Sequence, residues 1–550
     1  MKIPESEHIK ELAVDLVSQQ SIVDTPDEIK MAEKIYNIFA GMDYYKKHPE
    51  NLYYVDCKDD ALGRKVVVAE MNGEKGDSKK TVAMIGHFDT VGISDYGPLA
   101  EYNTKPYELA EKFKGVKLPP EAQADLESGD YLFGRGLFDM KSGDAIIIAM
   151  MEEIAKDIEN FEGNLVYGAV CDEEGNSGGM LNLVPKLVEL KKTKGYDYQA
   201  LLDPDYVAPA YPGDPLKYVY IGTVGKIMPT FYIFGKETHV GESFDGLDPN
   251  QIAAALTSRI NLNPEFSDTL EGEVTLPPIT LKQRDLKPEY SVQIANKAVV
   301  MFNFATHSWT PDIVLKKMKD AGQECFQEVV DTLNERYHKY CDMVGREFKP
   351  QPWVARTMTY SELYAAVKAE KGEQLDKDVA ALKEKLKKDN SIDARDKDLQ
   401  IVDFVHDQWS DHDPVLITFI TQPYYPHVFV DGAKAKDAKL IDSVKKAVAE
   451  TEPNYDYDLR PRKFLPCISD LSYGAAPKEK DAIDALKENE PGYGTLYELP
   501  LEDMAELDLP VADIGSFGKD AHKFTERVDM KATYEVTASL FVKTVENLLK

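Results

Sequence analysis

Consecutive carboxylates follow a strand-like apolar run in the first half of the chain. The run 165–171 precedes Asp172, Glu173 and Glu174, and a glycine-rich turn at 175–179 comes next. Such a run is typical of a buried strand, and open α/β sheets bind ligands at the carboxyl ends of their strands. Adjacent glutamates repel each other unless a cation or a shared proton lies between them, so one can bind a metal while its neighbour acts as a general base. Taken alone, the segment is also compatible with an acidic surface turn.

Further potential ligands lie at other predicted strand ends. They are His87 with Asp89, Asp139 just before a helix, Asp203 before a proline, and His522 near the end of the chain. Together with the glutamates, these imidazoles and carboxylates suit a pair of Zn²⁺-class ions, which activate a water for hydrolysis. Each residue also has an ordinary alternative: a polar strand-end histidine, a helix N-cap at Asp139, or an Asp-Pro turn at Asp203.

The order of these segments resembles the M20 family of metallopeptidases and aminoacylases. The matching motifs are His-x-Asp at 87–89, Gly-Arg-Gly-x-x-Asp-Met-Lys at 134–141, Asp-Glu-Glu at 172–174, the aspartate at 203 and Gly-x-Asp-Ala-His-Lys at 518–523. The resemblance covers most of the chain except about 344–412. The long acidic sequence, with Gly518–Val528, is most similar to the RocB-type arginine-utilisation branch of the family.

This resemblance implies two metal ions, each held by one histidine and one carboxylate, with a further carboxylate bridging them. The ligands are His87 and Asp203 for one ion, Glu174 and His522 for the other, and Asp139 as the bridge. Glu173 is then the general base and Asp89 orients His87, while the Asp139–Met140 peptide is expected to be cis. The implied cofactors are two Zn²⁺ ions per subunit, with Co²⁺ or Mn²⁺ as alternatives.

Two other segments resemble substrate-handling elements of the family. His239 matches the lid histidine that stabilises the developing oxyanion, and an exposed loop histidine is an equal alternative. In the family, this histidine serves its own subunit or, in a homodimer, the partner subunit. Ser469 and Asp470 resemble a substrate-facing element, for which a helix N-cap is equally plausible. The hairpin at 302–306 lacks the arginine that grips the substrate carboxylate in many members.

The elements that must position these residues alternate between strand and helix. The predicted strands are 52–56, 65–70, 81–85, 164–170 and 199–202, and the predicted helices 144–157 and 181–191. Such alternation predicts an α/β domain with a mainly parallel sheet and helices on both faces. The pattern returns after Pro426, with helices at 435–450 and 534–549 around a strand at 510–515.

Between these parts the order changes to β-α-β-β-α-β, which is a ferredoxin-like α+β unit. It includes a predicted hairpin of 291–295 with 299–306 and a long helix at 311–340 that starts with proline. The pattern predicts that residues 223–427 are inserted into an α/β domain of residues 1–222 and 428–550, and the M20 resemblance implies that this α/β domain is zinc-peptidase-like and catalytic. The lid domain, 223–427, would carry a family-atypical insertion at about 344–412, in which 375–388 is predicted as a solvated helix.

The amino-acid composition excludes some classes of binding partner. The 550 residues include 65 Lys and Arg against 96 Asp and Glu, a net charge of −31, which argues against nucleic acid and anionic membranes. The five cysteines lack metal-ligand spacing and indicate reduced thiols in a cytoplasmic protein. The chain shows no signal peptide and no membrane-length apolar run.

These observations favour a dinuclear metal-dependent hydrolase of amide bonds in small N-acyl amino acids or short peptides. Glu173 would act first as base and then as acid. The alternative from another class is a catalytically silent M20-like protein that binds a ligand or partner, which has no need for Glu173. A hydrolase with a single metal ion, or with another metal, is also compatible with these ligand types.

Overall fold

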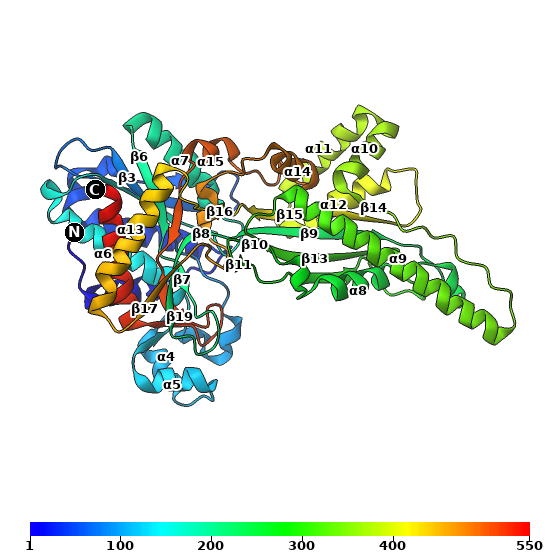
Figure 1. Ribbon diagram of the computed structural model, residues 1–550, viewed down its shortest axis with the longest axis horizontal. Coiled ribbons are helices and arrows are strands. Elements are labelled where there is room, and N and C mark those ends of the chain that lie inside the picture. The colour runs from blue at the N-terminus through cyan, green and yellow to red at the C-terminus, as the bar shows by residue number, and fades with distance from the viewer. The chain divides into compact units, whose positions relative to one another are not determined.

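The chain passes between two structural units four times in the computed structural model, which describes residues 1–550 (Figure 1). Unit 1 comprises Met1–Val224, Val428–Ala476 and Pro500–Lys550, and unit 2 comprises Gly225–His427 and Pro477–Leu499. We expected two passages, with 477–499 in the first domain. This segment belongs to unit 2 because helix α14 (Lys480–Asn489) buries Ala482, Leu486 and Asn489 there.

Unit 1 is built on a nine-stranded sheet in the order β1-β2-β5-β3-β6-β18-β8-β16, with β17 also paired to β8. The strands are β1 Leu52–Asp56, β2 Lys65–Asn72, β3 Lys80–His87, β5 Asn164–Val170, β6 Asp197–Asp203, β8 Leu216–Thr223, β16 Val428–Phe429, β17 Asp458–Arg462 and β18 Val511–Asp513. The four central strands β5, β3, β6 and β18 are parallel to one another. The pairs β1–β2, β2–β5, β18–β8 and β8–β16 are antiparallel, whereas β17 pairs parallel with β8. The sheet is therefore mixed, and of its antiparallel pairs only β1 and β2 are joined by a short connection.

Helices cover both faces of this sheet, as the alternation predicts. The main ones are α1 Ser6–Ser18, α2 Asp27–Gly41, α6 Ser142–Ala155, α7 Gly178–Lys194, α13 Ala435–Thr451 and α16 Ala538–Leu549. Two neighbouring residues of β5 show which of these helices covers which face of the sheet. The hydroxyl of Tyr167 donates to Asp144 of α6 at 2.6 Å, whereas Leu183 of α7 packs directly on Gly168. Since successive strand residues point to opposite faces, α6 and α7 lie on opposite sides of the sheet.

A smaller sheet in unit 1 carries the turn that contains His522. Its order is β4-β20-β19-β7. The strands are β4 Tyr131–Phe133, β7 Tyr206–Val207, β19 Ser516–Lys519 and β20 Arg527–Asp529. Next to it, the 3-10 helix η2 (Ser94–Tyr102), α4 (Pro106–Phe113) and α5 (Pro120–Ser128) share a small apolar core of their own.

Unit 2 is organised by a five-stranded sheet in the order β12-β13-β9-β15-β14. Its elements are β9 Gly225–Phe234, α8 Pro249–Ile260, β12 Ile279–Asp285, β13 Lys297–Thr306, α9 Pro311–Val344, β14 Thr357–Thr359 and β15 Val415–Tyr425. Without β14, this is the ferredoxin-like arrangement. The predicted hairpin strand at 291–295 is wrong, because the partner of β13 is β12. This edge strand is largely exposed on both sides, so its sequence lacks the alternation of a half-buried strand.

The insertion at 344–412 folds mainly into helices α10 (Tyr360–Lys371), α11 (Glu373–Lys387) and α12 (Ala394–Asp407). They form a core with Tyr232 of β9, whereas its neighbour Phe231 faces α9 at Gly322. The inserted helices therefore cover the sheet face opposite α9, and every residue of β15 is buried. The expectation of a solvated helix near 375–388 is wrong for one side of α11, which buries Leu375, Val379 and Leu386.

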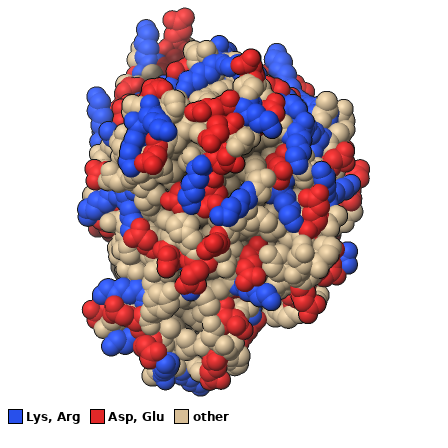
Figure 2. All heavy atoms as spheres, turned by 90° about the vertical axis from the view of Figure 1, so that its left-hand side faces the viewer, with Lys and Arg blue, Asp and Glu red and all other residues tan.

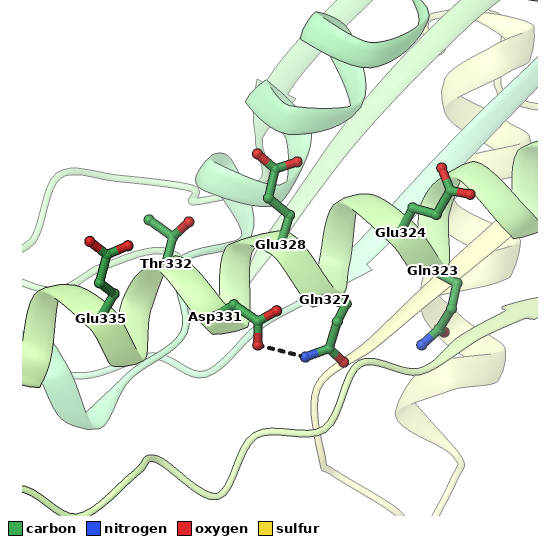
Figure 3. Close-up of a pocket in the computed structure, with 7 residues that line it drawn as sticks. All are labelled: Gln323, Glu324, Gln327, Glu328, Asp331, Thr332 and Glu335. Carbon is green, nitrogen blue, oxygen red and sulfur yellow. Dashed lines mark hydrogen bonds between the residues drawn. The ribbon is translucent and has the colours of Figure 1, made fainter.

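Charged side chains of both signs are interspersed over the face drawn in Figure 2. One pocket lies along α9, and Figure 3 shows that all of its labelled lining residues come from this single helix. They are Gln323, Glu324, Gln327, Glu328, Asp331, Thr332 and Glu335. This acidic helix face contains none of the predicted site residues. No helix is both long and apolar enough to cross a membrane.

Candidate metal centre

Asp139 lies between the two predicted histidine ligands. Its Oδ1 is 3.0 Å from Nε2 of His87, and its Oδ2 is 3.0 Å from Nε2 of His522. Burial raises the pKa of this carboxyl group, but its interactions with the imidazoles of His522 and His87 outweigh that effect and lower it. Asp139 is 3% exposed, and its pairing with the two imidazoles offsets the cost of burying its charge. The Asp139–Met140 peptide is cis.

His87 ends strand β3, which places its ring at the carboxyl edge of the large sheet. Its Nδ1 donates to the backbone carbonyl of Asp89 at 3.1 Å, because a carbonyl oxygen can only accept. This bond leaves Nε2 as the ring atom that faces Asp139. We expected the Asp89 carboxylate to orient the ring, but its Oδ1 is 3.7 Å from Nδ1.

The carboxylate of Asp89 instead holds the acidic turn after β5. Its oxygens accept hydrogen bonds from the backbone amides of Glu173 at 3.2 Å and Glu174 at 3.0 Å. The same turn is anchored from the other side by Asp172, which accepts from Nη1 of buried Arg64 at 2.9 Å. Two fixed points therefore hold the backbone that carries Glu173 and Glu174.

His522 and Glu174 form the second half of the centre. Nε2 of His522 is 2.9 Å from Oε1 of Glu174 as well as 3.0 Å from Asp139. Desolvation lowers the pKa of His522, but the hydrogen bonds to Asp139 and Glu174 raise it to about 10. The imidazole side chain is 46% exposed, so it lies at the open edge of the centre.

The third carboxylate near His87 is Asp205, not the predicted Asp203. Oδ1 of Asp205 is 3.9 Å from Nε2 of His87, and these two residues form a group with Asp139. Asp203 is the last residue of β6, and its Oδ2 accepts from Oγ of Ser469 at 2.9 Å. The sequence Asp203-Pro204-Asp205 contained a signal for this alternative, since it offers a second carboxylate, Asp205, two residues after Asp203.

Each half of the centre has the composition of a divalent metal site. His87, Asp139 and Asp205 form one group, and Asp139, Glu174 and His522 form the other, with the ligand atoms of each group within 4.8 Å of one another. Burial raises the pKa of Asp205 to about 8 and raises that of Glu174, and the negative charge of Asp139 adds to both effects. A divalent cation in each group would offset this repulsion, so the residues present fit two ions that share Asp139.

The family comparison is decisive. The sequence profile of peptidase family M20/M25/M40 matches residues 115–547. The chain is 31% identical to Protein RocB of Bacillus subtilis (strain 168) over 545 residues, which covers 99% of this chain and 95% of RocB. It is 34% identical to the uncharacterized protein YqjN of the same organism over 548 residues, 98% of this chain and 96% of YqjN.

The chain belongs to peptidase family M20/M25/M40.

Solved structures agree with this fold. A tripeptidase from Staphylococcus aureus subsp. aureus Mu50 superposes with a TM-score of 0.54 at 13% identity, covering 100% of both chains. The dipeptidase Dug1p of Saccharomyces cerevisiae gives a TM-score of 0.52 at 13% identity, covering 99% of this chain and 98% of Dug1p. The predicted α/β fold class, the M20 membership and the similarity to RocB are confirmed. The protein is thus an enzyme of a metal-dependent family that hydrolyses amide bonds.

In this M20 enzyme, Glu526 binds the backbone of the Asp139 loop, although the sequence motifs did not point to it. Its Oε2 accepts from Nη1 of Arg135 at 2.6 Å, and its Oε1 accepts from the backbone amide of Gly136 at 2.8 Å and that of Asp139 at 3.4 Å. Glu526 therefore ties the loop of His522 to the loop of Asp139. The only sequence signal was its position four residues after His522.

Glu173 lies beside the centre without belonging to either ligand group. Burial raises its pKa well above the usual range; the charge of His87 opposes this, whereas Asp470 and Glu174 add to it. A raised pKa is the property that a carboxylate needs to take a proton near neutral pH.

The remaining predicted residues have the following surroundings. Ser469 is fully buried, donates to Asp203, and accepts from the backbone amide of Leu471 as an N-cap does. Asp470 is 2% exposed. His239 is an exposed residue of unit 2, and its Nδ1 accepts from the backbone amide of Gly241 at 3.1 Å.

Proposed function

We propose that this protein is a dinuclear metal-dependent hydrolase of amide bonds in small N-acyl amino acids or short peptides. The observation that carries the proposal is the position of Asp139, whose two oxygens each lie 3.0 Å from a different imidazole. One ion would be held by His87, Asp139 and Asp205, and the other by Asp139, Glu174 and His522. Zn²⁺ is the expected metal, with Co²⁺ or Mn²⁺ as alternatives for these nitrogen and oxygen ligands.

The residues of the chain divide the chemistry between them. When bound, such an ion pair polarises the scissile carbonyl and makes a water more acidic. Glu173 takes a proton from that water and then delivers it to the leaving amine, because its raised pKa suits both transfers. The backbone bonds from Glu173 and Glu174 to Asp89 keep this base beside the ligand Glu174.

His239 is the proposed donor to the developing oxyanion. Because Nδ1 accepts from the Gly241 amide, the neutral ring carries its proton on Nε2, which is the form that a donor needs. We expect His239→Ala to retain metal and fold while turnover falls on the order of 10²–10³-fold. Unchanged turnover would contradict this role and show that His239 is an exposed loop residue without a catalytic function. Ser469–Asp470 stays a predicted substrate-facing element.

The test of the function is hydrolysis by the metal-loaded protein of a panel of N-acyl amino acids and dipeptides. The similarity to RocB makes arginine derivatives the first choice within this panel. The Glu173→Gln variant keeps the shape of the side chain but removes the proton acceptor. We expect near wild-type metal content with a rate loss on the order of 10²–10⁴-fold.

The panel also separates the proposal from its rival, a catalytically silent binding protein of the same family. A silent protein would bind members of the panel without releasing an amine, and Glu173→Gln would change nothing. Amine release that depends on both added metal and Glu173 supports the hydrolase.

A further inference from the structure

His522 lies on an exposed turn whose backbone is unusual. The turn joins β19 to β20, and both Asp520 (φ 61°) and His522 (φ 65°) adopt the left-handed conformation. This conformation is uncommon for residues other than glycine, although aspartate and histidine adopt it more readily than most, and the contacts described below hold it here. A ligand on such a turn is oriented only as well as its flanking residues are held.

The flank before His522 is held by Arg527. Nη1 of this fully buried arginine donates to Oδ2 of Asp520 at 2.5 Å and to the carbonyl of Thr525 at 3.0 Å. The Thr525 hydroxyl donates to the same Asp520 oxygen at 2.9 Å. These bonds close the turn across its base, two residues before the ligand.

Arg527 is itself anchored outside the turn, on helix α5. Its Nε donates to Oδ2 of Asp125 at 2.7 Å, and Nζ of Lys519 lies 3.0 Å from the same oxygen. Lys519 and Arg527 are directly paired across β19 and β20. One carboxylate of α5 therefore holds both strands that lead into and out of the turn.

The flank after His522 is held by the same segment. Phe524 packs on the small apolar core of η2, α4 and α5, with its ring centroid 6.0 Å from that of Phe113 in an edge-on arrangement. The ring of Phe113 in turn packs edge-on against that of Phe133 of β4, with 5.5 Å between the ring centroids. Residues two before and two after His522 are thus fixed to elements that contribute no ligand.

We propose that the segment Ser94–Ser128 positions His522, with Asp125 and Arg527 as the positioning residues, and so sets the affinity of the Asp139–Glu174–His522 group for its divalent ion. The inference rests on the proposed dinuclear function. The other ion should be much less sensitive, because His87 and Asp205 are positioned by the ends of β3 and β6. Asp125 acts through Arg527 and the turn, not by contact with the metal.

The test uses the full-length, metal-free protein titrated with Zn²⁺ alone in a calorimeter. Asp125→Asn removes the charge on α5 while keeping the side-chain shape. We expect one ion to bind as in the wild type and the other to bind on the order of 10–100-fold more weakly. The unfolding midpoint is recorded on the same samples. Asp125→Glu, which keeps the charge, should restore part of the lost affinity.

The matched control is Glu127→Gln, the same chemical change on the same helix. Glu127 is exposed and its carboxylate accepts from Gln123 of α5. This variant should bind both ions as the wild type does. Phe524→Ala removes the other anchor and should weaken the same single ion.

The outcomes separate the inference from the proposed function. Suppose that the wild type binds two ions. If Asp125→Asn binds both ions with wild-type affinity, or if the affinities for both ions fall by the same factor, the positioning role is overturned and the dinuclear site stands. If the wild type itself binds fewer than two ions, the dinuclear proposal fails and the inference fails with it.

Discussion

The carboxylate of Asp89 lies 3.0 Å from the backbone nitrogen of Glu174, which is a proposed metal ligand. Asp89 also accepts from the backbone of Glu173, the proposed base, and its carbonyl accepts from His87. A single buried residue thus organises three members of the centre. Its main contact is with the backbone of the acidic turn, not with the imidazole that the family resemblance suggested.

Asp89→Asn should therefore disturb both catalysis and metal binding. The amide can offer only one acceptor oxygen to two backbone N–H groups, and a buried donor left unsatisfied costs about 1–3 kcal/mol. We expect turnover to fall on the order of 10–100-fold and the ion at Glu174 to bind more weakly. Steady-state kinetics with metal analysis checks this, and wild-type values for both would contradict it.

Substitution of Asp205 and substitution of Asp203 should affect metal binding differently, although the two residues are only two positions apart. Asp205→Asn should weaken one ion on the order of 10–100-fold or more, because Asp205 is grouped with His87 and Asp139. Asp203→Asn should keep both ions, since its carboxylate accepts from Ser469. Zn²⁺ titration of the two variants side by side decides between them. The opposite ranking would restore Asp203 as the ligand.

Metal binding should tighten as the pH rises. In the metal-free protein the pKa of His522 is raised to about 10, and a metal ligand must be a neutral imidazole. Protonation of His522 stabilises the metal-free folded state. This stabilisation is complete below pH about 6.5, the ordinary histidine pKa, and is lost as the pH rises through about 10. Below pH about 10, metal binding therefore displaces a proton from His522, and the raised pKa values of Asp205 and Glu174 add to the release, so the affinity should increase tenfold or more per pH unit.

Calorimetric titrations in buffers with different ionisation enthalpies measure this proton release. His522→Ala is the control, since it should remove one ion and the part of the proton release that comes from this imidazole, while the release from Asp205 remains. Proton release close to zero at pH 8 in the wild type would contradict the prediction.

A pair of buried carboxyl groups in unit 2 predicts a second pH effect. Burial raises the pKa of Asp398 to about 7, and burial together with Asp398 raises that of Glu490 well above its usual range. The unfolded chain ionises Asp398 near pH 4 while the folded unit keeps the proton, so stability should fall as the pH rises from about 4 to 7. Asp398→Asn should reduce this fall, and the part that comes from the burial of Glu490 should remain.

Thermal unfolding at pH 5 and pH 8 checks the effect. Above pH 7 the variant should gain roughly 2–4 °C in the unfolding midpoint for each kcal/mol of burial cost removed. Asp396→Asn, on the same helix but with a partly exposed carboxylate, should retain the wild-type difference between the two pH values. Identical pH profiles for Asp398→Asn and the wild type would contradict the prediction.

Much of the centre was predictable from local pattern. His87, Asp139, Glu174 and His522 lie close together in the structure, as the order of their motifs led us to expect. The sequence pointed to Asp203, whereas the structure groups Asp205 with His87 and Asp139, because which carboxylate lies at the centre depends on where β6 ends and how the chain runs past Pro204. That point is set by the partner strand: Ile514 donates to the Asp203 carbonyl at 3.0 Å, and Ser516 donates to that of Asp205 at 2.9 Å.

The larger errors came from tertiary packing. Edge strand β12 has no buried face to impose a period of two on its sequence. Helix α14 looks like a polar loop segment, and only its contacts show where it belongs: the side chain of Asn489 accepts from the backbone amide of Ser361 at 3.0 Å. Such contacts join residues far apart along the chain, and local periodicity carries no information about them.

The return of Pro477–Leu499 to unit 2 has a practical consequence for dissecting the protein. A fragment of residues 225–427 would expose the surface that α14 covers and would leave Asp398 without Glu490. A self-contained version of unit 2 needs both segments, joined by a linker that replaces 428–476. For the same reason, a protease cut in any one of the four connections would leave the two units joined by the other three.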